Sequence, residues 1–468
     1  MVTQHRQLYT YCVMELISIL LLCALKSTAS EATDSSRVHT KPLSIVITTL
    51  PLAGHVTPAA NLGEELVRRG HRVTLCTAEL EGTDIGRKKA EAAGMNYVNA
   101  GNSSFSIGRV QDMVETAGLE NLTVGSVKAA VSEGLKTLSL LPDISNIVGK
   151  FLDNQNFTDY DMIISTEFLA QMTACLSKKW NVPATILSTT FQFQPEHLPP
   201  WPFPPHYMNK RGTLYTSDNL DFVRRLLSVI FKPIAILALD FMFIRKAINT
   251  LEFECPNSTY SFLKYFPGTN APQIVPTVIG FEYPRTVSPL THYVGPILSK
   301  QSQTIPDDLQ EWLDTKSKSS VILISMGSMV PLTKKRGQII IESIQPTNYS
   351  VIWSLRDRNR FILDGLELDG NRFFVSKWIP QSALLKHPAT AMALLHGGMN
   401  GINEALSHGV PVIAMPFASD QGDVSARLHH SGAGIQILKE YLSKETLTAA
   451  ISNIQEGKSW CKDCRHTD

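Results

Sequence analysis

A buried strand, a short loop and a helix that leads into another strand form the pattern that most restricts how this chain can fold. The segment LSIVITT at residues 43–49 reads as an apolar strand, and apolar residues then recur at helical spacing until Gly70. We expect Thr57 to cap this helix and Pro58 to be its first residue. Residues 73–76 begin the next strand. Such a β-loop-α-β unit is the element of a parallel, doubly wound sheet.

Similar units recur further along the chain. Residues 160–166 predict a strand. A helix to about residue 179 follows it, and then a strand at 184–188. The segment 291–314 is expected to be a linker into a second domain. Beyond it, a second series of strands is expected at 321–325, 349–354, 372–375, 391–395 and 412–415. Two α/β domains around a cleft are the simplest architecture for this pattern.

Length, charge and cysteine content narrow the class of protein. The 468 residues suffice for two or three domains, each with a core. Lys and Arg number 43 and Asp and Glu 42, so a net charge of +1 gives no overall attraction to nucleic acid or to an anionic membrane. Seven scattered cysteines argue against a disulfide-built scaffold. Cys461 and Cys464 have the spacing of metal ligands but lack a second ligand pair, so no zinc site is expected.

The N-terminal residues predict entry into the secretory pathway. An apolar run at 14–24 and small residues at 27–30 indicate a signal peptide over residues 1–30, with a retained signal anchor as the alternative. Five glycosylation sequons agree with this route; they lie at Asn102, Asn121, Asn156, Asn257 and Asn348. The apolar segment 229–244 predicts a buried or membrane-surface helix. We therefore expect a glycoprotein of the endoplasmic reticulum lumen or a secreted one, and membrane association through the N-terminal domain remains open.

The segment LLHGGMNGINEALSHGVPV, at residues 394–412, carries the clearest binding pattern. His396 stands at an expected strand end, where open α/β sheets bind ligands. Gly397 and Gly398 would let backbone N–H groups approach an anion. His396, Asn400 and Glu404 are spaced by four, which predicts one face of the following helix. A tight turn and a core histidine are the alternatives for single residues, but the combination suits a diphosphate joined to a ribose.

Three further segments fit the same ligand. Ser328, in the strand-end turn SMGS, can offer a hydroxyl to phosphate. Trp378 and Gln381, in WIPQ, can stack on a base and read its edge, although Trp378 could equally be a core residue. Asp420 and Gln421 offer an acceptor and an amide to sugar hydroxyls, with a helix cap as the alternative for Asp420.

Taken in order along the chain, the segments WIPQ, HGGMNGINEALSHGVPV and PFASDQ resemble the nucleotide-sugar signature of the UDP-glycosyltransferases, including the UDP-glucuronosyltransferases. Weaker similarity covers residues 43–456, including GHVTP and HYVGPI. The resemblance implies a GT-B fold, with two doubly wound Rossmann-like domains facing a cleft. Residues 31–290 would bind the acceptor and residues 291–456 the UDP-sugar, with an atypical tail at 457–468.

The resemblance also implies a role for each residue of the signature. Trp378 and Gln381 would bind uracil, Glu404 would bind ribose, and Asp420 and Gln421 would bind the sugar. Ser328, His396 and Asn400 would bind the diphosphate, beside Gly397 and Gly398. Val424 stands where the family often has Asn, so the resemblance does not extend to one polar contact on the donor side. UDP-sugar would be a co-substrate, with no cofactor and no metal expected.

A general base is the other requirement of an inverting transfer, and the first domain offers His55. It lies in an expected strand-to-helix loop after Gly54, and the resemblance gives the histidine of GHVTP the role of base. A histidine that caps the next helix is the alternative. Counting forward from Asp161 puts the family's carboxylate partner at Thr166, whereas counting back from Asn181 puts it at Glu167, the residue that we favour.

The resemblance leaves two functions open. The first is an inverting transfer of a hexose or hexuronate from a UDP-sugar to a hydroxyl of a small lipophilic acceptor, which would lie against residues 191–207. The aromatic side chains of segment 191–207 could equally well pack in a core. The second is a weak or inactive homologue, because relatives usually continue with a crossing helix and a membrane anchor that the tail does not resemble. Homo- or hetero-oligomers with relatives stay open as partners; nucleic acid is not expected.

Overall fold

The computed structural model describes most of the chain that follows the expected signal peptide. The described residues are 41–109, 143–154, 160–189, 271–278, 280–282, 289–301, 303–328, 330, 332–417 and 420–457. The predictions for the signal peptide, the segments 191–207 and 229–244, Cys461 and Cys464, and three of the sequons lie outside these residues. Asn102 and Asn348 are described and exposed. Among the described helices, none has the length and apolar character needed to cross a membrane.

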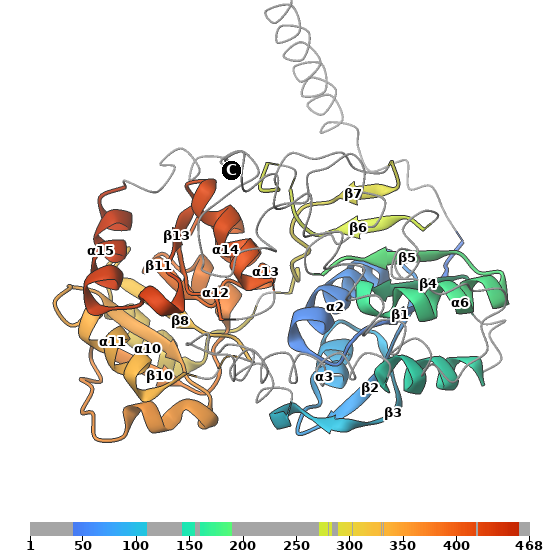
Figure 1. The fold of residues 1–468 in the computed structure, drawn as a ribbon, viewed down its shortest axis with the longest axis horizontal. Helices are drawn as coiled ribbons and strands as arrows, with labels where there is room; N and C mark the ends of the chain where they lie inside the picture. Colours follow the sequence, from blue (N-terminus) through green and yellow to red (C-terminus); the bar gives the residue numbers. More distant parts are fainter. Residues whose placement is uncertain are drawn as a thin grey trace, which may run out of the picture. The chain divides into compact units, whose positions relative to one another are not determined.

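The first sheet contains seven parallel strands in the order β3-β2-β1-β4-β5-β6-β7 (Figure 1). The strands are β1 (Ser44–Thr48), β2 (Arg72–Glu81), β3 (Asn96–Ser106), β4 (Met162–Thr166), β5 (Ala184–Leu187), β6 (Gln273–Val275) and β7 (Thr291–Tyr293). Its helices are α2 (Ala53–Arg68), α3 (Ile85–Ala92), α6 (Ala170–Trp180) and a helix at residues 143–153, with a 3-10 turn η2 (Glu167–Leu169).

Successive side chains of β1 are buried on opposite faces of this sheet. Ile45 and Ile47 pack with residues of α2 and α3, whereas Val46 packs with residues of α6 and of the helix at 143–153. Successive strand residues point to opposite faces, so one apolar strand supplies two cores. Each fully buried Ile or Val side chain stabilises the fold by about 1.5–3 kcal/mol relative to exposure.

The second sheet contains six parallel strands in the order β10-β9-β8-β11-β12-β13. The strands are β8 (Val321–Ser325), β9 (Ser350–Ser354), β10 (Phe373–Ser376), β11 (Thr390–Leu395), β12 (Val412–Ala414) and β13 (Gly434–Gln436). The helices are α10 (Asp307–Asp314), α11 (Lys334–Ile344), α12 (Gln381–Lys386), α13 (Met399–Ser407), α14 (Gln421–His430) and α15 (Lys444–Gln455), with 3-10 turns η7 (Asp357–Leu363) and η8 (Lys439–Tyr441).

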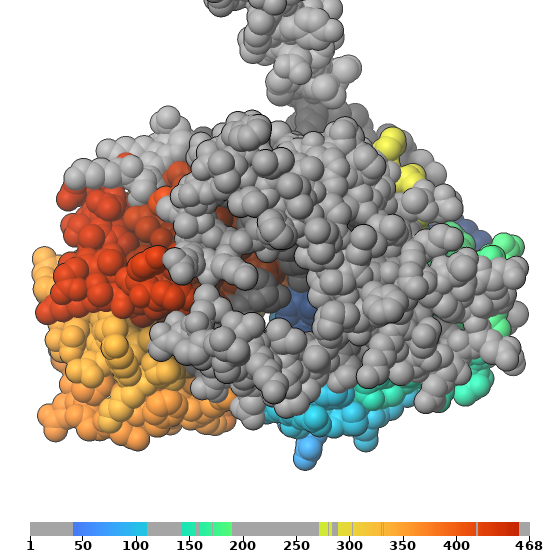
Figure 2. Space-filling view, in the orientation of Figure 1, coloured from blue at the N-terminus to red at the C-terminus, as the bar shows by residue number. Residues whose placement is uncertain are grey.

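Helices cover both faces of this sheet as well. Ile322 and Ile324 face residues of α11 and α15, and Val321 and Leu323 face residues of α10, α12, α13 and α14. Thr448 Oγ1 of α15 donates to a carbonyl of α11, 3.3 Å away. In the space-filling view, α15 appears as a red surface against the yellow-orange segments of the same sheet's helices (Figure 2).

The strand orders put a topological switch point in each sheet. In the first sheet the order reverses between β1 and β4, and in the second between β8 and β11. Ligands of open α/β sheets bind outside the carboxyl ends of the strands at such a point. His55 and Glu167 follow β1 and β4, and Gly327 and His396 follow β8 and β11. The predicted site residues His55, Glu167 and His396 therefore lie at the switch points.

Two expectations for the start of the fold differ from the structure. The helix after β1 begins at Ala53 with Leu52 as its N-cap, so Thr57 is not the cap and Pro58 lies inside the helix. The N–H groups of His55 and Val56 already donate to the Leu52 carbonyl, both at 2.9 Å. The helix thus starts five residues earlier than proline placement indicates. The segment 291–314, expected to be a linker, contains β7 and α10, and β7 belongs to the first sheet.

Candidate active site

His55 lies in the first turn of α2, at the carboxyl edge of the first sheet. Its side chain is 8% exposed, and its ring meets the edge of Phe168 at 5.3 Å between centroids. Nδ1 lies 2.5 Å from Thr189 Oγ1. No residue in the described part of the chain hydrogen-bonds to Nε2. Nδ1 is therefore held from the protein side, and Nε2 is the nitrogen available for chemistry.

Glu167 is joined to His55 through Thr189. Glu167 begins the turn η2 directly after β4. Its Oε2 accepts the Thr189 N–H at 2.9 Å, and both carboxylate oxygens lie 3.1 Å from Thr189 Oγ1. Thr166 Oγ1 is buried and has no hydrogen-bond partner among the described residues. Of the two alternatives for the carboxylate partner, Glu167 is the one that the structure connects to the histidine.

Electrostatics around His55 favour the neutral ring. Burial lowers the pKa of His55, and the negative charge of Glu167 raises that pKa by less. An imidazolium with a lowered pKa loses its proton more readily, so the His55 imidazole is neutral at neutral pH. A neutral ring with one nitrogen held and one open has the form that a general base requires.

His396 stands at the end of β11, and its ring lies between two glycines. A Cβ atom on Gly327 would be 2.6 Å from Cε1 of the ring, and one on Gly398 would be 2.6 Å from Nε2. Gly398 therefore makes room for the histidine itself, besides any approach of an anion. Gly397 has φ +82°, and a Cβ there would meet the Gln421 carbonyl at 3.0 Å. His396 also precedes α13, so only Asn400 and Glu404 share the helix face on which all three were expected.

The His396 ring is neutral at physiological pH. Burial lowers the pKa of His396 to about 4, opposed by a backbone hydrogen bond at Ser325. A neutral imidazole can still donate one N–H, so His396 can contact a phosphate as a hydrogen-bond donor without a charge. Ser328 lies half-buried in the turn after β8, close in sequence to the Gly327 that packs on this ring.

Two of the residues expected to bind uridine, Gln381 and Glu404, are hydrogen-bonded to each other. Gln381 Nε2 donates to Glu404 Oε2 at 2.6 Å, which joins the start of α12 to α13. Burial raises the pKa of Glu404, and the Gln381 bond and the charge of Lys89 oppose this. Trp378 is 60% exposed and belongs to no core, so its indole face is accessible for stacking. The alternative of a core tryptophan is wrong.

Asn400 reaches the helix that carries His55. Its Nδ2 donates to the Gly54 carbonyl at 3.1 Å. That carbonyl lies four residues before Pro58, which has no N–H to donate to it. The proline inside α2 thus leaves an acceptor that the amide of α13 satisfies. In this structure, Asn400, expected to bind the diphosphate, is hydrogen-bonded to the residue next to His55, the expected base.

Asp420 and Gln421 lie where α14 begins. Asp420 is the N-cap residue of α14, as the alternative expected, but its side chain makes no capping hydrogen bond. Burial raises the pKa of Asp420 to about 6, helped by the charges of Asp423 and Glu167 and opposed by that of Arg427. Gln421 Oε1 accepts the Phe417 N–H at 2.9 Å, which joins the first residue of the helix to the segment after β12. Val424, where the family often has Asn, is fully buried in the apolar core.

A buried ion cluster holds α14 in place. Arg427 Nη2 lies 2.6 Å from Asp423 Oδ2, and Nη1 pairs with Glu282 Oε1. The arginine side chain is 2% exposed and both carboxylates are 8% exposed. Arg427 also lies over the Phe281 ring, 5.7 Å from its centroid. The cluster therefore ties the helix of the expected sugar-binding residues to the segment between β6 and β7.

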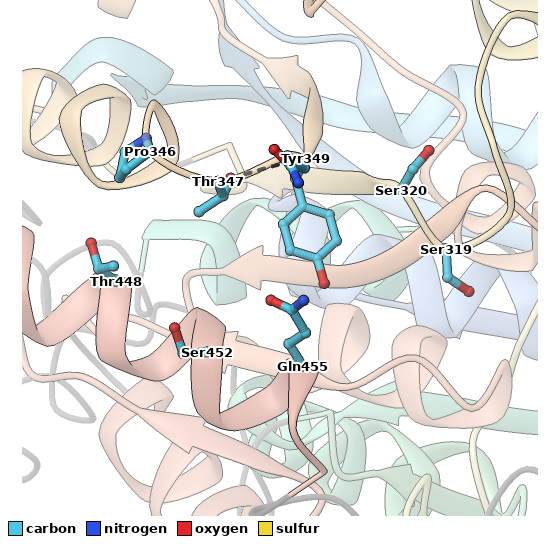
Figure 3. Close-up of a pocket in the computed structure, with 9 residues that line it drawn as sticks. Ser319, Ser320, Pro346, Thr347, Tyr349, Thr448, Ser452 and Gln455 are labelled. Carbon is cyan, nitrogen blue, oxygen red and sulfur yellow. Dashed lines mark hydrogen bonds between the residues drawn. The ribbon is translucent and has the colours of Figure 1, made fainter.

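A separate cavity of about 400 Å³ lies at the amino ends of β8 and β9, away from the carboxyl ends where the expected site residues lie (Figure 3). It is lined by residues that precede β8 and β9 and by α15, among them Ser320, Asn348, Tyr349 and Gln455. None of the expected site residues lines it. Within the described ranges, no three His, Cys, Asp or Glu side chains gather in a way that could hold a metal ion.

Comparison with known proteins identifies the family. A family model described as UDP-glucoronosyl and UDP-glucosyl transferase matches residues 47–466, nearly the whole chain. The chain belongs to this family. It is thus a member of a family of UDP-sugar glycosyltransferases, and the resemblance seen in the sequence is confirmed.

Relatives of this UDP-glycosyltransferase family member include two human enzymes. UDP-glucuronosyltransferase 2B7 of Homo sapiens is 24% identical over 426 residues, which cover 85% of this chain and 75% of that protein. UDP-glucuronosyltransferase 2A2 of Homo sapiens is 31% identical over 182 residues, 39% of this chain and 33% of that protein. The matched regions thus span a third to three quarters of these relatives.

Solved structures confirm the fold class. The glycotransferase of kitacinnamycin has a TM-score of 0.58 and 18% identity, covering 91% of this chain and 94% of that one. The calicheamicin glycosyltransferase CalG4 has a TM-score of 0.58 and 17% identity, with 91% and 92% covered. The fold is therefore of the GT-B type, with two parallel α/β sheets.

Proposed function

We propose that this protein is an inverting glycosyltransferase that moves a hexose or hexuronate from a UDP-sugar to a hydroxyl of a small lipophilic acceptor. The observation that carries the proposal is the pairing of two sites at sheet switch points. One holds a neutral, buried His55 linked to Glu167. The other is centred on His396 at the end of β11, and the further donor-binding residues that the family signature implies follow β8, β10 and β12.

The first sheet supplies the base of the proposed reaction. His55 Nε2 takes the proton of the acceptor hydroxyl while the oxygen attacks the anomeric carbon of the sugar. The bond from that carbon to the β-phosphate oxygen breaks on the opposite side, and its electron pair leaves with UDP. Attack opposite to the leaving group inverts the configuration, and a base with a lowered pKa suits work at neutral pH.

The second sheet supplies the donor site. Trp378 would stack on uracil beside Gln381, and Glu404 would accept the ribose hydroxyls. Ser328, His396, Asn400 and the N–H groups after Gly397 and Gly398 would hold the diphosphate, at a helix N-terminus that favours negative charge. Asp420 and Gln421 would accept and donate to the sugar hydroxyls. The donor requires no metal or cofactor in this proposal.

The names of relatives suggest the substrates, and the sequence suggests the cellular compartment. The human relatives are named for transfer of glucuronate, and Os79 from O. sativa was solved with U2F and trichothecene (TM-score 0.55, 17% identity, 90% of this chain and 92% of that one). We propose UDP-glucuronate or UDP-glucose as donor and a lipophilic alcohol or phenol as acceptor. The sequence features above support a glycoprotein made in the secretory pathway.

The configuration of the product tests the proposed reaction. An α-linked UDP-sugar and a phenolic acceptor are expected to give a β-linked glycoside, because one displacement inverts the anomeric carbon. Proton NMR of the product measures the coupling constant at that carbon. An α-linked product would overturn the single-displacement mechanism with His55 as base.

The pH dependence of donor binding tests the role of Asp420. Because the pKa of Asp420 is raised to about 6, its carboxylate gains a proton as pH falls through 6 and can no longer accept from two sugar hydroxyls. We expect the KM for the UDP-sugar to rise by roughly fivefold between pH 6 and pH 5, following the ionised fraction of Asp420.

Asp420→Asn is the matched variant for this measurement. It keeps the size of the side chain but cannot titrate, so its KM is expected to be high and flat across the same pH range. UDP itself lacks the sugar, so its affinity serves as the control. A wild-type KM independent of pH between 5 and 7 would contradict the role given to Asp420.

A further inference from the structure

Thr189 lies between the expected base and its carboxylate. It follows β5, the strand next to β4 in the sheet, and the adjacent Ser188 N–H donates to the Ile274 carbonyl of β6 at 2.9 Å. In the part of the chain that the structure describes, the Thr189 side chain hydrogen-bonds to His55 and Glu167 alone. Its side chain is 2% exposed.

The number of protons available determines which group donates and which accepts in the two hydrogen bonds of Thr189. An ionised carboxylate only accepts, so the Thr189 hydroxyl must donate its one proton to Glu167. The Thr189 oxygen then has lone pairs but no second proton. It can only accept from His55, which must carry its proton on Nδ1. The unprotonated nitrogen of the neutral ring is therefore Nε2.

We propose that Thr189 is a positioning residue that sets the tautomer of His55 and carries the hydrogen bond of Glu167 to it. This role rests on the proposed glycosyl transfer, in which Nε2 of His55 receives the acceptor's proton. Without an acceptor at Nδ1, the ring can protonate at Nε2 instead, and it then has no lone pair toward the acceptor hydroxyl.

The chain of contacts also determines how the imidazolium is stabilised. When Nε2 gains the proton, the Nδ1–H stays on the ring and the Thr189 proton stays on its oxygen, so no proton passes to Glu167. The carboxylate acts through a polarised hydroxyl, and the Thr189 N–H holds Oε2 at 2.9 Å. A hydroxyl thus does the orienting that a carboxylate does when it bonds directly to a catalytic histidine.

Substitutions that keep the shape of Thr189 separate its hydroxyl from its packing. Thr189→Val replaces the hydroxyl by a methyl group of similar size, and Thr189→Ser keeps the hydroxyl and removes the methyl. We expect Thr189→Val to lower kcat by roughly 10- to 100-fold with the affinity for UDP unchanged. Thr189→Ser is expected to stay within about threefold of wild type, because the relay is kept.

A second readout does not depend on activity. Nitrogen-15 NMR of labelled histidine distinguishes the two neutral tautomers, and wild type is expected to show His55 protonated at Nδ1. Thr189→Val is expected to shift this signal toward protonation at Nε2, and Thr189→Ser to retain it. If wild type transfers no sugar, the proposed function fails while the tautomer still tests the relay.

Three outcomes would overturn the assignment. One is a Thr189→Val protein with wild-type kcat. Another is a His55 tautomer that does not change in this variant. The third is a Thr189→Ser protein that loses as much activity as Thr189→Val while both keep the circular dichroism spectrum and UDP affinity of wild type.

Discussion

Replacing His55 by Ala is expected to lower kcat by between about 10² and 10⁴ fold and to leave the affinity for UDP unchanged. His55 is the base of the proposed transfer, and its loss leaves the acceptor hydroxyl with no group to take its proton. The residues proposed to bind UDP follow strands of the second sheet, so the nucleotide is expected to keep its contacts. Initial rates of UDP release measure kcat, and isothermal calorimetry with UDP measures the affinity.

A histidine elsewhere in the same sheet provides the control. His71 precedes β2, at the amino end of the strands, and its Nδ1 accepts the Leu43 N–H at 3.1 Å. His71→Ala removes a structural contact remote from the switch point and is expected to keep kcat. His396→Ala is the converse variant, because it should weaken UDP binding. A His55→Ala protein with wild-type turnover would refute the assignment of the base.

Replacing Arg427 by Met is expected to lower the free energy of unfolding by about 3–5 kcal/mol. The arginine is nearly inaccessible and pairs with Asp423 and Glu282, which are buried as well. Met fills similar space but removes the guanidinium that pairs with both carboxylates, and removing one partner of a buried ion pair is strongly destabilising. Urea unfolding followed by fluorescence measures the change.

An exposed arginine gives the matched control. Arg68, on α2, pairs with Glu65 at 2.6 Å, but its side chain is 58% exposed. Water and salt screen such a pair, so Arg68→Met is expected to leave stability close to wild type. Adding Asp423→Asn and Glu282→Gln to Arg427→Met should recover part of the loss, because the two buried carboxylate charges are then removed. Equal effects of the two arginine substitutions would contradict the account of the buried cluster.

Strong apolar runs made most of the sheet predictable. The strand expected at 321–325 is β8, and those at 391–395 and 412–415 overlap β11 and β12. The three-residue strands β6, β7 and β13 were not expected, because so short a segment shows no periodicity. β12 has the same length but lies in the longer apolar run 410–415, which made it predictable. The start of α2 was placed too late because Pro58 reads as a first helical residue, whereas Asn400 satisfies the carbonyl that it leaves open.

The site was predictable where its residues are close in sequence. The signature from Trp378 to Gln421 falls on the expected strand ends and helix starts, and local spacing identifies such positions. Thr189 could not be found in this way, because it meets His55 only when β5 lies beside β4. The role of Gly398 in making room for the His396 ring is equally a matter of packing. Thr189 directly follows the strand expected at 184–188, and this place at the carboxyl end of an expected strand was the one available signal for it.

The transfer reaction itself tests the central claim most directly. The purified full chain is incubated with UDP-glucuronate or UDP-glucose and a broadly accepted phenol, and glycoside and UDP are both quantified. The account predicts equal amounts of the two products, both lost in His55→Ala, which still binds UDP. UDP binding by wild type without glycoside from any donor would contradict the account and support a homologue that binds UDP-sugar without transferring it.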